Sequence, residues 1–225
     1  MSATRAVLLD LDGTLADPRE GFVRCARHAL DRLGIACPPD DDLARHIGPP
    51  LHHTLGVLVG GNPSVAVGLF RERYETTGIF ENTIYPGVPA MLRALRASGL
   101  RMFVATSKPT IFARRIIRHF GLDEFFDGLH GSELDGTRGD KAHLIAAMMD
   151  SERLGATATV MVGDREHDIR AARANGMSSV GALWGYGSRN ELESAGATAL
   201  CAAPSDLRGV LAAHAWPSHP SPFPA

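Results

Sequence analysis

The sequence is poor in cysteine and lysine and contains no long apolar run. Its three cysteines, Cys25, Cys37 and Cys201, are too few and too widely spaced for a disulfide framework or a zinc cluster. No stretch approaches the roughly 18 consecutive apolar residues of a transmembrane helix. Because the first apolar run ends at Asp10, we expect no signal peptide. The net charge of −2 gives no electrostatic attraction to nucleic acid polymers or membrane surfaces. These absences predict a cytoplasmic protein that binds neither nucleic acid polymers nor membranes.

The rest of the composition is ordinary, apart from the rarity of lysine. Apolar residues make up 44% of the chain and charged residues 21%, as in many globular proteins. A length of 225 residues fits one large domain, or one domain that carries an insertion. Lysine occurs only twice, as Lys108 and Lys141. Both lysines fall inside strings that other residues mark as candidate site segments, so their positions are informative.

The most informative string is DLDGTLAD at residues 10–17. The four apolar residues at 6–9 predict a buried strand that ends on Asp10. Asp12 follows two residues later, and a Gly-Thr pair then breaks the strand into a turn. Open α/β sheets bind ligands at this edge. Two carboxylates crowded there repel each other, so they need a cation or a shared proton between them.

Three later strings place further polar groups after predicted strands or at a helix start. The strand candidate at 101–106 leads into Thr106 and Ser107, whose hydroxyl and backbone N–H groups can hold a phosphate. Lys141 follows a candidate helix cap, where the helix dipole disfavours a cation unless an anion lies beside it. Another strand ends at Asp164, with Asp168 one helical turn further on. Taken singly, each string also fits an ordinary capped helix or a solvated lysine.

Strand-like and helix-like segments alternate over most of the chain, which predicts a parallel sheet covered by helices on both faces. Residues 16–83 differ, because they contain several helical patterns and no convincing strand. The Pro- and Ser-rich segment after Trp216 is expected to be loosely held. The expected strands lie at 6–10, 101–106, 127–131, 159–163 and 179–184, and the expected helices at 19–33, 41–47, 51–59, 64–77, 87–98, 110–120, 140–150 and 168–175.

In this order and context, the four strings resemble the haloacid dehalogenase-like (HAD) hydrolase superfamily. Segments at 85–88, 120–127 and 171–177 look like phosphoglycolate phosphatases, and those at 133–138 and 183–188 like the bacterial 5′-nucleotidase-like branch. The resemblance implies an α/β fold with a Rossmann-like, doubly wound parallel sheet formed by residues 1–15 and 84–225. It also implies an all-helical cap domain at 16–83, with hinges near 16–18 and 82–86. Closure of such a cap excludes water from a site.

The resemblance assigns chemical roles to the acidic residues. Asp10 would be the nucleophile that forms an aspartyl phosphate. Asp12 would act first as general acid and then as general base. A Mg²⁺ cofactor would be held by Asp10, Asp164 and the backbone carbonyl of Asp12, because magnesium prefers oxygen ligands.

The remaining site residues follow from the same resemblance. Thr106 and Lys141 would be catalytic, and together with Ser107 they would bind the phosphoryl group. Asp168 would lie behind them and hydrogen-bond the metal ligands or the lysine. In the cap, a Gly-Pro-Pro turn at 48–50 resembles a substrate-specificity loop. The turn could present Arg45 or His46 to the substrate, and we take Arg45 as the expected contact.

The implied function is Mg²⁺-dependent hydrolysis of a small phosphate monoester, with phosphoglycolate or a nucleoside 5′-monophosphate as the leading substrates. A sugar-phosphate mutase of the same fold and a catalytically silent binding protein are the alternatives. Asp12 argues against dehalogenation, and the lack of lysine in the expected cap argues against Schiff-base chemistry on phosphonates. The chain could be a monomer or a homodimer.

Overall fold

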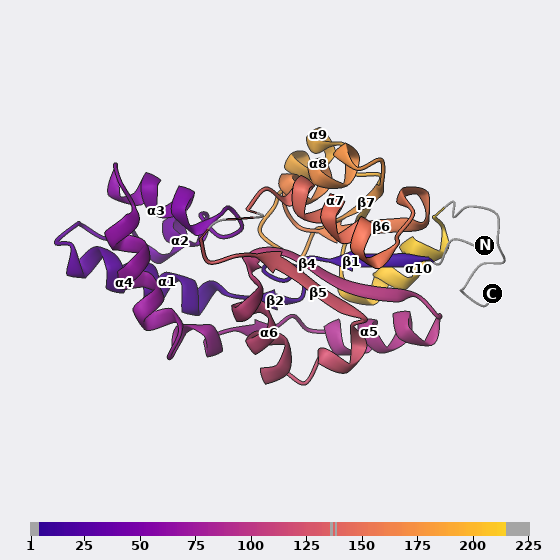
Figure 1. Cartoon of the computed structure of the whole chain (residues 1–225), viewed down its shortest axis with the longest axis horizontal. Coiled ribbons are helices and arrows are strands. Elements are labelled where there is room, and N and C mark those ends of the chain that lie inside the picture. Colours follow the sequence, from indigo (N-terminus) through magenta and orange to yellow (C-terminus); the bar gives the residue numbers. More distant parts are fainter. Residues whose placement is uncertain (1–4, 136, 138, 215–225) are drawn as a thin grey trace.

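A parallel sheet forms the centre of the protein (Figure 1). The computed structural model describes residues 5–135, 137 and 139–214. Within these residues the six strands of the sheet lie in the order β5-β4-β1-β6-β7-β8, and every neighbouring pair is parallel. The strands are β1 (Ala6–Leu9), β4 (Arg101–Pro109), β5 (Gly128–Ser132), β6 (Thr159–Gly163), β7 (Ser178–Ala182) and β8 (Ala199–Cys201).

Helices cover both faces of this sheet, as Figure 1 shows. One face carries α5 (Val88–Ala97), α6 (Thr110–His119) and α10 (Leu207–Ala212), and the other carries α7 (Lys141–Glu152), α8 (Glu166–Ala174) and α9 (Arg189–Ala195). From β1 the chain winds outward through β4 and β5, and it then returns to β6 on the other side of β1. Such a reversal leaves a crevice at the carboxyl ends of the strands, where α/β proteins bind ligands. The predicted doubly wound α/β fold is confirmed.

Burial on both faces explains the unbroken apolar run at the start of the chain. Val7 and Leu9 on β1 join the hydrophobic cluster on the α5 and α6 side of the sheet. Ala6 and Leu8 point the other way and pack with Phe103 and the residues of α7. All four residues of the strand are fully buried. A strand buried on both faces cannot alternate apolar and polar residues, so the run continues until Asp10 reaches the edge of the sheet.

A helical cap is inserted between β2 (Ala16–Asp17) and β3 (Thr83–Ile84), which pair as a short antiparallel ribbon. Figure 1 shows the cap helices grouped at one end of the molecule, away from both termini. The ribbon lies where the sequence predicts the hinges, and the exact cap boundaries at 16 and 83 stay a prediction. The cap comprises α1 (Arg19–Arg32), α2 (Asp40–Ala44), α3 (Leu51–Val59), α4 (Ser64–Tyr74) and the 3₁₀ turn η1 (Gly78–Phe80).

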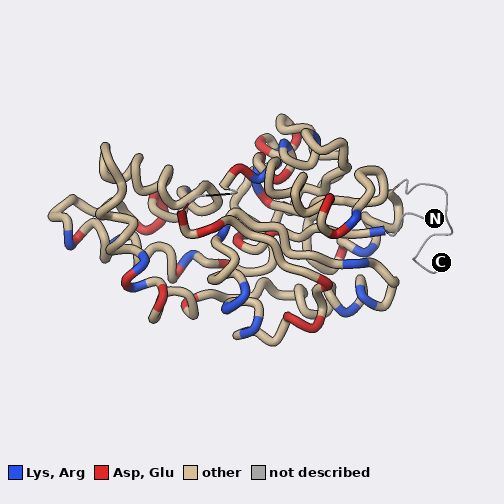
Figure 2. The backbone as a smooth tube through the Cα atoms, in the orientation of Figure 1, with Lys and Arg blue, Asp and Glu red and all other residues tan. Residues whose placement is uncertain are grey.

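Some short elements were not expected from the sequence. Strand β8 and helices α9 and α10 are short, and so are the 3₁₀ turns η2 (Asp123–Phe125), η3 (Ala156–Ala158) and η4 (Pro204–Asp206). Acidic and basic residues are interspersed along the described backbone (Figure 2). None of the helices in the described ranges has the length and apolar character needed to cross a membrane. The expectation about the segment after Trp216 falls outside the described residues.

Candidate active site

Asp10 lies at the end of β1, in the middle of the sheet, and its carboxylate meets Lys141. The backbone N–H of Asp10 donates to the carbonyl of Val162 on β6, at 3.0 Å, which fixes the end of the strand. Lys141 Nζ lies 2.7 Å from Asp10 Oδ1 and also contacts Asp168. All three side chains are buried. Asp140 caps helix α7 by accepting from the backbone N–H of His143, so Lys141 stands in the first helical turn, as the sequence predicts.

Opposite charges stabilise each other inside this buried pair. Burial raises the pKa of Asp10, and the ammonium of Lys141 opposes that rise. For Lys141, burial disfavours the charged form, but Asp10 and Asp168 outweigh it and hold the lysine pKa above its usual value. The cost of a cation at a helix N-terminus is therefore offset by the two carboxylates that it contacts.

Asp164 follows β6 and is bound by neutral groups. Its Oδ2 accepts from the backbone N–H of Tyr186 at 2.8 Å, and its Oδ1 accepts from the hydroxyl of Thr14 at 3.3 Å. Gly13 makes this approach possible: its φ is +88°, and a Cβ there would lie 2.2 Å from Asp164 Oδ2. Burial raises the pKa of Asp164 well above its ordinary value, and the charges of Asp168 and Asp10 add to that rise.

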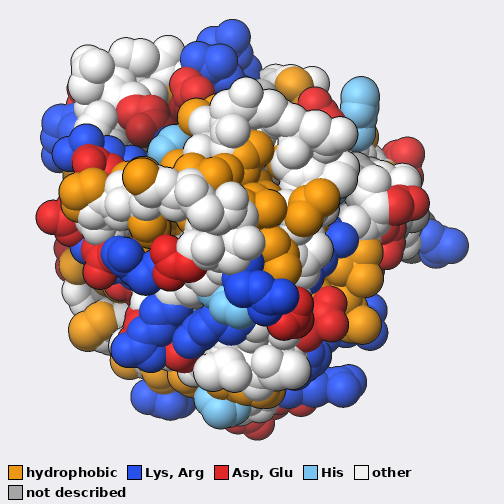
Figure 3. Space-filling view, turned by 90° about the vertical axis from the view of Figure 1, so that its left-hand side faces the viewer, with side chains coloured by type: hydrophobic (Ala, Val, Ile, Leu, Met, Phe, Trp, Pro, Cys, Tyr) orange, Lys and Arg blue, Asp and Glu red, His pale blue; other side chains and the backbone are white. Residues whose placement is uncertain are grey.

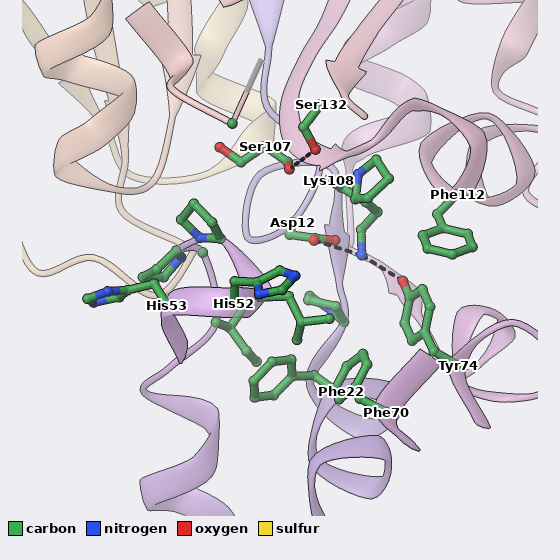
Figure 4. A pocket seen from close by; sticks show the side chains of 18 of the residues that line it. Asp12, Phe22, His52, His53, Phe70, Tyr74, Ser107, Lys108, Phe112 and Ser132 are labelled. Atoms are coloured by element: carbon green, nitrogen blue, oxygen red, sulfur yellow. Dashed lines mark hydrogen bonds and ion pairs between the residues drawn. The ribbon is translucent and has the colours of Figure 1, made fainter. Parts of the chain in front are cut away.

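Asp12 faces a different lysine. Its Oδ2 lies 2.8 Å from Lys108 Nζ, and the same ammonium donates to the hydroxyl of Tyr74 at 2.6 Å (Figure 4). Between Thr106 and Pro109 the pairing of β4 with β5 shifts register, so Lys108 lies in an irregular stretch of the strand. Such irregularities re-aim side chains next to binding sites. Burial raises the pKa of Asp12, and Lys108 opposes the rise.

Thr106 and Ser107 lie beside these groups at the end of β4. The Thr106 hydroxyl is buried and accepts from the backbone N–H of Lys108 at 3.2 Å. The carbonyl of Ser107 accepts from the Ser132 hydroxyl at 2.8 Å. A small cavity joins these residues to Asp10 and Asp12. It is lined by Asp10, Asp12, Gly48, Thr106, Ser107, Lys108, Lys141, Arg165 and His167.

A larger cavity of about 440 Å³ adjoins it between the cap and the sheet. Asp12, Ser107 and Lys108 lie on its sheet side, and aromatic rings of the cap form much of the opposite wall (Figure 4). Figure 3 views the molecule from the cap end and shows apolar side chains gathered near the middle of that face. The cap contributes Phe22, Phe70 and Tyr74 to this wall, and α6 of the core adds Phe112.

The structure does not bring Arg45 into this arrangement. Its side chain is 79% exposed and its guanidinium pairs with Asp42 at 3.0 Å. Arg45 is absent from the lining of both cavities. The turn that follows does reach the site, because Gly48 lines both cavities. It is held there by Arg165, whose Nη1 donates to the carbonyl of Ile47 at 2.5 Å.

Several residues of the site were missed by the sequence reasoning. Arg165 and His167 lie inside the acidic string at 164–168, and that position is the signal that could have drawn attention to them. Lys108 has a similar signal, since it is one of only two lysines. Tyr74 carries no such signal, because it lies far from the four strings and reaches the site only through the tertiary fold. Tyr186 lies in the segment at 183–188 that resembles the 5′-nucleotidase-like branch, and the structure adds its contact with Asp164.

The charges of the described side chains at this site do not balance. Four carboxylates (Asp10, Asp12, Asp164 and Asp168) face two ammonium groups (Lys108 and Lys141). Arg165 adds no net charge, because it pairs with Glu191 at 2.9 Å. The excess of two negative charges matches one divalent cation. Ligand oxygens of Asp10, Asp164 and Asp168 lie within 4.8 Å of one another, so this buried cluster could hold a metal ion.

Within the cluster, Asp10 and Asp164 fit a metal better than Asp168. One oxygen of Asp168 contacts Lys141, and the other accepts from the backbone N–H of Arg165 at 3.0 Å. Asp164 has only neutral donors, so its charge is uncompensated within the described side chains. An all-oxygen donor set suits a hard cation such as Mg²⁺.

Sheet order, helical cap and buried aspartates together define the class: an α/β protein with a helical cap over an acidic site at the carboxyl ends of its strands. Comparison with known proteins identifies the family. Residues 7–182 match the family model described as haloacid dehalogenase-like hydrolase, and the chain belongs to this family. The predicted HAD-like phosphatase is thereby confirmed.

The similar proteins are named as a nucleotidase, phosphatases and a kinase. A 5′-nucleotidase of Pseudomonas aeruginosa is 46% identical over 211 residues, which cover 92% of this chain and 96% of that protein. A phosphoglycolate phosphatase of Xanthomonas campestris is 34% identical, with 83% and 86% covered. The tyrosine-protein kinase PtkA of Mycobacterium tuberculosis is 43% identical over 80% of this chain and 62% of its own length. A crystal structure of a predicted phosphatase from Clostridium acetobutylicum superposes with a TM-score of 0.88 at 35% identity, covering 93% of this chain and 98% of that one.

Proposed function

We propose that this HAD-like phosphatase hydrolyses a small phosphate monoester through a phosphorylated Asp10, with Mg²⁺ as cofactor. The observation that carries the proposal is the buried contact between Asp10 and Lys141, beside the uncompensated carboxylate of Asp164. Asp10 and Asp164, with the backbone carbonyl of Asp12, would hold the metal. When bound, Mg²⁺ supplies positive charge that reduces repulsion between the carboxylate nucleophile and the phosphate.

The side chains of the site account for two chemical steps. An oxygen of Asp10 bonds to phosphorus while the ester P–O bond breaks, and Asp12 donates its proton to the leaving oxygen. Water then attacks the aspartyl phosphate, Asp12 takes a proton from it, and inorganic phosphate leaves with Asp10 restored. Lys141 stabilises the charge on the transferring group and on Asp10. Thr106 and Ser107 orient the phosphoryl oxygens.

Among substrates, a nucleoside 5′-monophosphate fits the cavity better than phosphoglycolate. A volume of about 440 Å³ is large for a leaving group as small as glycolate. The aromatic wall offers faces on which a planar base can stack. The likeness to a protein named 5′-nucleotidase supports the same choice. We also propose that the substrate is a small-molecule ester, that the protein is cytoplasmic and that it is a monomer or a homodimer.

Asp10→Asn tests the covalent step. The substitution is nearly isosteric but removes the nucleophile, so Mg²⁺-dependent turnover of 4-nitrophenyl phosphate should disappear while the thermal unfolding transition stays cooperative. Turnover in EDTA serves as the background. Residual activity of Asp10→Asn well above that background, in protein free of the wild type, would exclude an aspartyl phosphate at this residue. A wild-type protein that shows no metal-dependent turnover would favour the silent binding protein instead.

A metabolite panel tests the substrate choice. The values of kcat/KM for nucleoside 5′-monophosphates should exceed the value for phosphoglycolate. Conversion of a sugar phosphate into its isomer without phosphate release would identify the protein as a mutase.

A further inference from the structure

One contact across the boundary between cap and sheet reaches the acid/base residue. Lys108 Nζ lies between the Asp12 carboxylate, at 2.8 Å, and the Tyr74 hydroxyl, at 2.6 Å (Figure 4). Lys108 belongs to β4 of the core, whereas Tyr74 is the last residue of α4 in the cap. The lysine side chain is only 9% exposed. A chain of contacts therefore links the cap to Asp12 through a single buried cation.

The two oxygens of Asp12 have different surroundings. Oδ2 is taken by Lys108. Oδ1 is buried and has no hydrogen-bond partner among the described residues. Asp12 lines both the small cavity at Asp10 and the large cavity under the cap. Since Oδ2 is paired with Lys108, the unpaired Oδ1 is the oxygen of Asp12 that remains for the leaving group.

Lys108 is itself held on two sides. Its backbone N–H donates to the Thr106 hydroxyl at 3.2 Å, which ties its main chain to the end of the strand. Its ammonium lies 5.0 Å from the centroid of the Tyr74 ring, in addition to its contact with the hydroxyl. The Tyr74 ring packs against Phe70 and Phe112, with centroids 5.5 Å and 5.4 Å away. Because packed rings have little rotational freedom, the hydroxyl is presented to Lys108 in a defined direction.

This inference rests on the proposed function. We propose that Lys108 and Tyr74 are positioning residues for Asp12: Tyr74 fixes the ammonium of Lys108, and Lys108 turns Asp12 so that its free oxygen meets the leaving oxygen of the substrate. The arrangement is complete only when α4 is docked on the sheet. Proton transfer to the leaving group is thereby linked to the position of the cap.

A pair of aryl esters separates this role from a general effect on the fold. Phenyl phosphate and 4-nitrophenyl phosphate have nearly the same shape, but phenolate is the poorer leaving group and depends more on protonation by an acid. The kcat/KM value reports the steps up to departure of the leaving group. Misplacing Asp12 should therefore lower kcat/KM more for phenyl phosphate than for 4-nitrophenyl phosphate.

Tyr74→Phe is the primary variant, because it keeps the ring packing and removes only the hydroxyl. We expect kcat/KM for phenyl phosphate to fall about 10-fold and that for 4-nitrophenyl phosphate about 2-fold or less, a part of what a positioned acid contributes. Lys108→Met should change the ratio of the two values in the same direction and further. Thermal unfolding shows whether Lys108→Met folds, and Tyr74→Phe decides the question if it does not.

Arg115→Gln is the matched control. Arg115 Nη2 donates to the carbonyl of Glu75 at 2.8 Å, another contact between α6 and the cap, one residue beyond Tyr74. It touches no residue of the site, so the ratio between the two esters should stay at the wild-type value. An equal loss on both esters in Tyr74→Phe, no loss on either, or the same change of ratio in Arg115→Gln overturns the positioning role while the proposed function stands. A wild type that hydrolyses neither ester overturns both.

Discussion

Replacing Asp164 by asparagine should make the metal-free protein more stable, although it removes a residue of the site. The carboxylate is fully buried, receives hydrogen bonds from Thr14 and Tyr186, and has no cationic partner among the described side chains. It shares the cluster with Asp10 and Asp168, whose oxygens lie within 4.8 Å. Asparagine has the same shape and no charge, so it keeps the packing and removes the repulsion.

The size of the effect follows from the geometry. Two unit charges at 4.8 Å interact with about 3.5 kcal/mol at an effective dielectric constant of about 20. Lys141 offsets part of this, because it already pairs with Asp10 and Asp168. We therefore expect Asp164→Asn to be more stable than the wild type in EDTA by about 1–3 kcal/mol, or roughly 2–10 °C in Tm.

The pH dependence of stability independently checks the direction of the effect expected for Asp164→Asn. Burial raises the pKa of Asp164 above its ordinary value of 3.8, so the native state binds more protons at this site than the unfolded state. Stability then falls as the pH rises from 3.8 towards the raised pKa, and the loss is complete above it. The advantage of Asp164→Asn should therefore grow from acidic to alkaline pH and then level off.

Chemical denaturation in EDTA at several pH values measures this difference, and a Mg²⁺ titration completes the test. Mg²⁺ should raise the Tm of the wild type, more so at higher pH, because a bound ion stabilises the folded state by mass action. It should stabilise Asp164→Asn much less. A variant that is less stable than the wild type in EDTA at alkaline pH, or one that Mg²⁺ stabilises equally, would refute the charge argument.

Two further predictions concern the cap. Arg165→Gln removes the hydrogen bond to the Ile47 carbonyl and the ion pair with Glu191, so the turn at 48–50 is held less firmly. If this turn contacts the substrate, as we propose, KM should rise about 5-fold with kcat changed little. A fall in kcat at constant KM, measured by steady-state kinetics, would contradict this. The carboxylate of Glu81 pairs with Nη1 and Nη2 of Arg73 at 2.6 and 2.9 Å. Glu81→Gln should therefore lower the free energy of unfolding by about 1 kcal/mol at neutral pH. Because Arg73 lowers the pKa of Glu81 below 4.5, this stabilisation is complete above pH 4.5 and is lost in acid. The free energies of unfolding of the wild type and of Glu81→Gln, measured by urea denaturation, should therefore converge at low pH.

The acidic residues at the strand ends of the site could be predicted from the sequence, because the apolar pattern of each strand by itself marks where the strand ends. A strand buried on both faces must be apolar throughout, so the first acidic residue marks the point where it leaves the core. This rule locates Asp10 after β1 and Asp164 after β6, which are neighbours in the sheet. Parallel pairing then brings both carboxylates to one edge without further information. Strand β8, with three residues, is too short to carry such a pattern.

The cap contacts could not be predicted in the same way, because they depend on how two units dock. Arg45 precedes a turn that does reach the site, yet its own side chain points to solvent and pairs with Asp42. Tyr74 ends a helix whose aromatic residues look like ordinary core in the sequence, and only its contact with Lys108 shows otherwise. Residue spacing fixes which side of a helix a side chain occupies, but not what stands opposite.

The number of charges in the site could be counted from the sequence, whereas their pairing could not. The four aspartates to which the resemblance gives roles (Asp10, Asp12, Asp164 and Asp168) outnumber the two lysines of the chain by two negative charges. The structure adds that Lys141 spans Asp10 and Asp168, and that Lys108 takes Asp12. One of the two uncompensated charges therefore falls on Asp164, and the other is shared by Asp10 and Asp168, whose single cation among the described side chains is Lys141. Both lie beside the proposed nucleophile and away from Asp12, the proposed acid/base residue. A cation bound there would neutralise the proposed nucleophile and leave the carboxyl that we propose exchanges a proton undisturbed, as the proposed two-step hydrolysis requires.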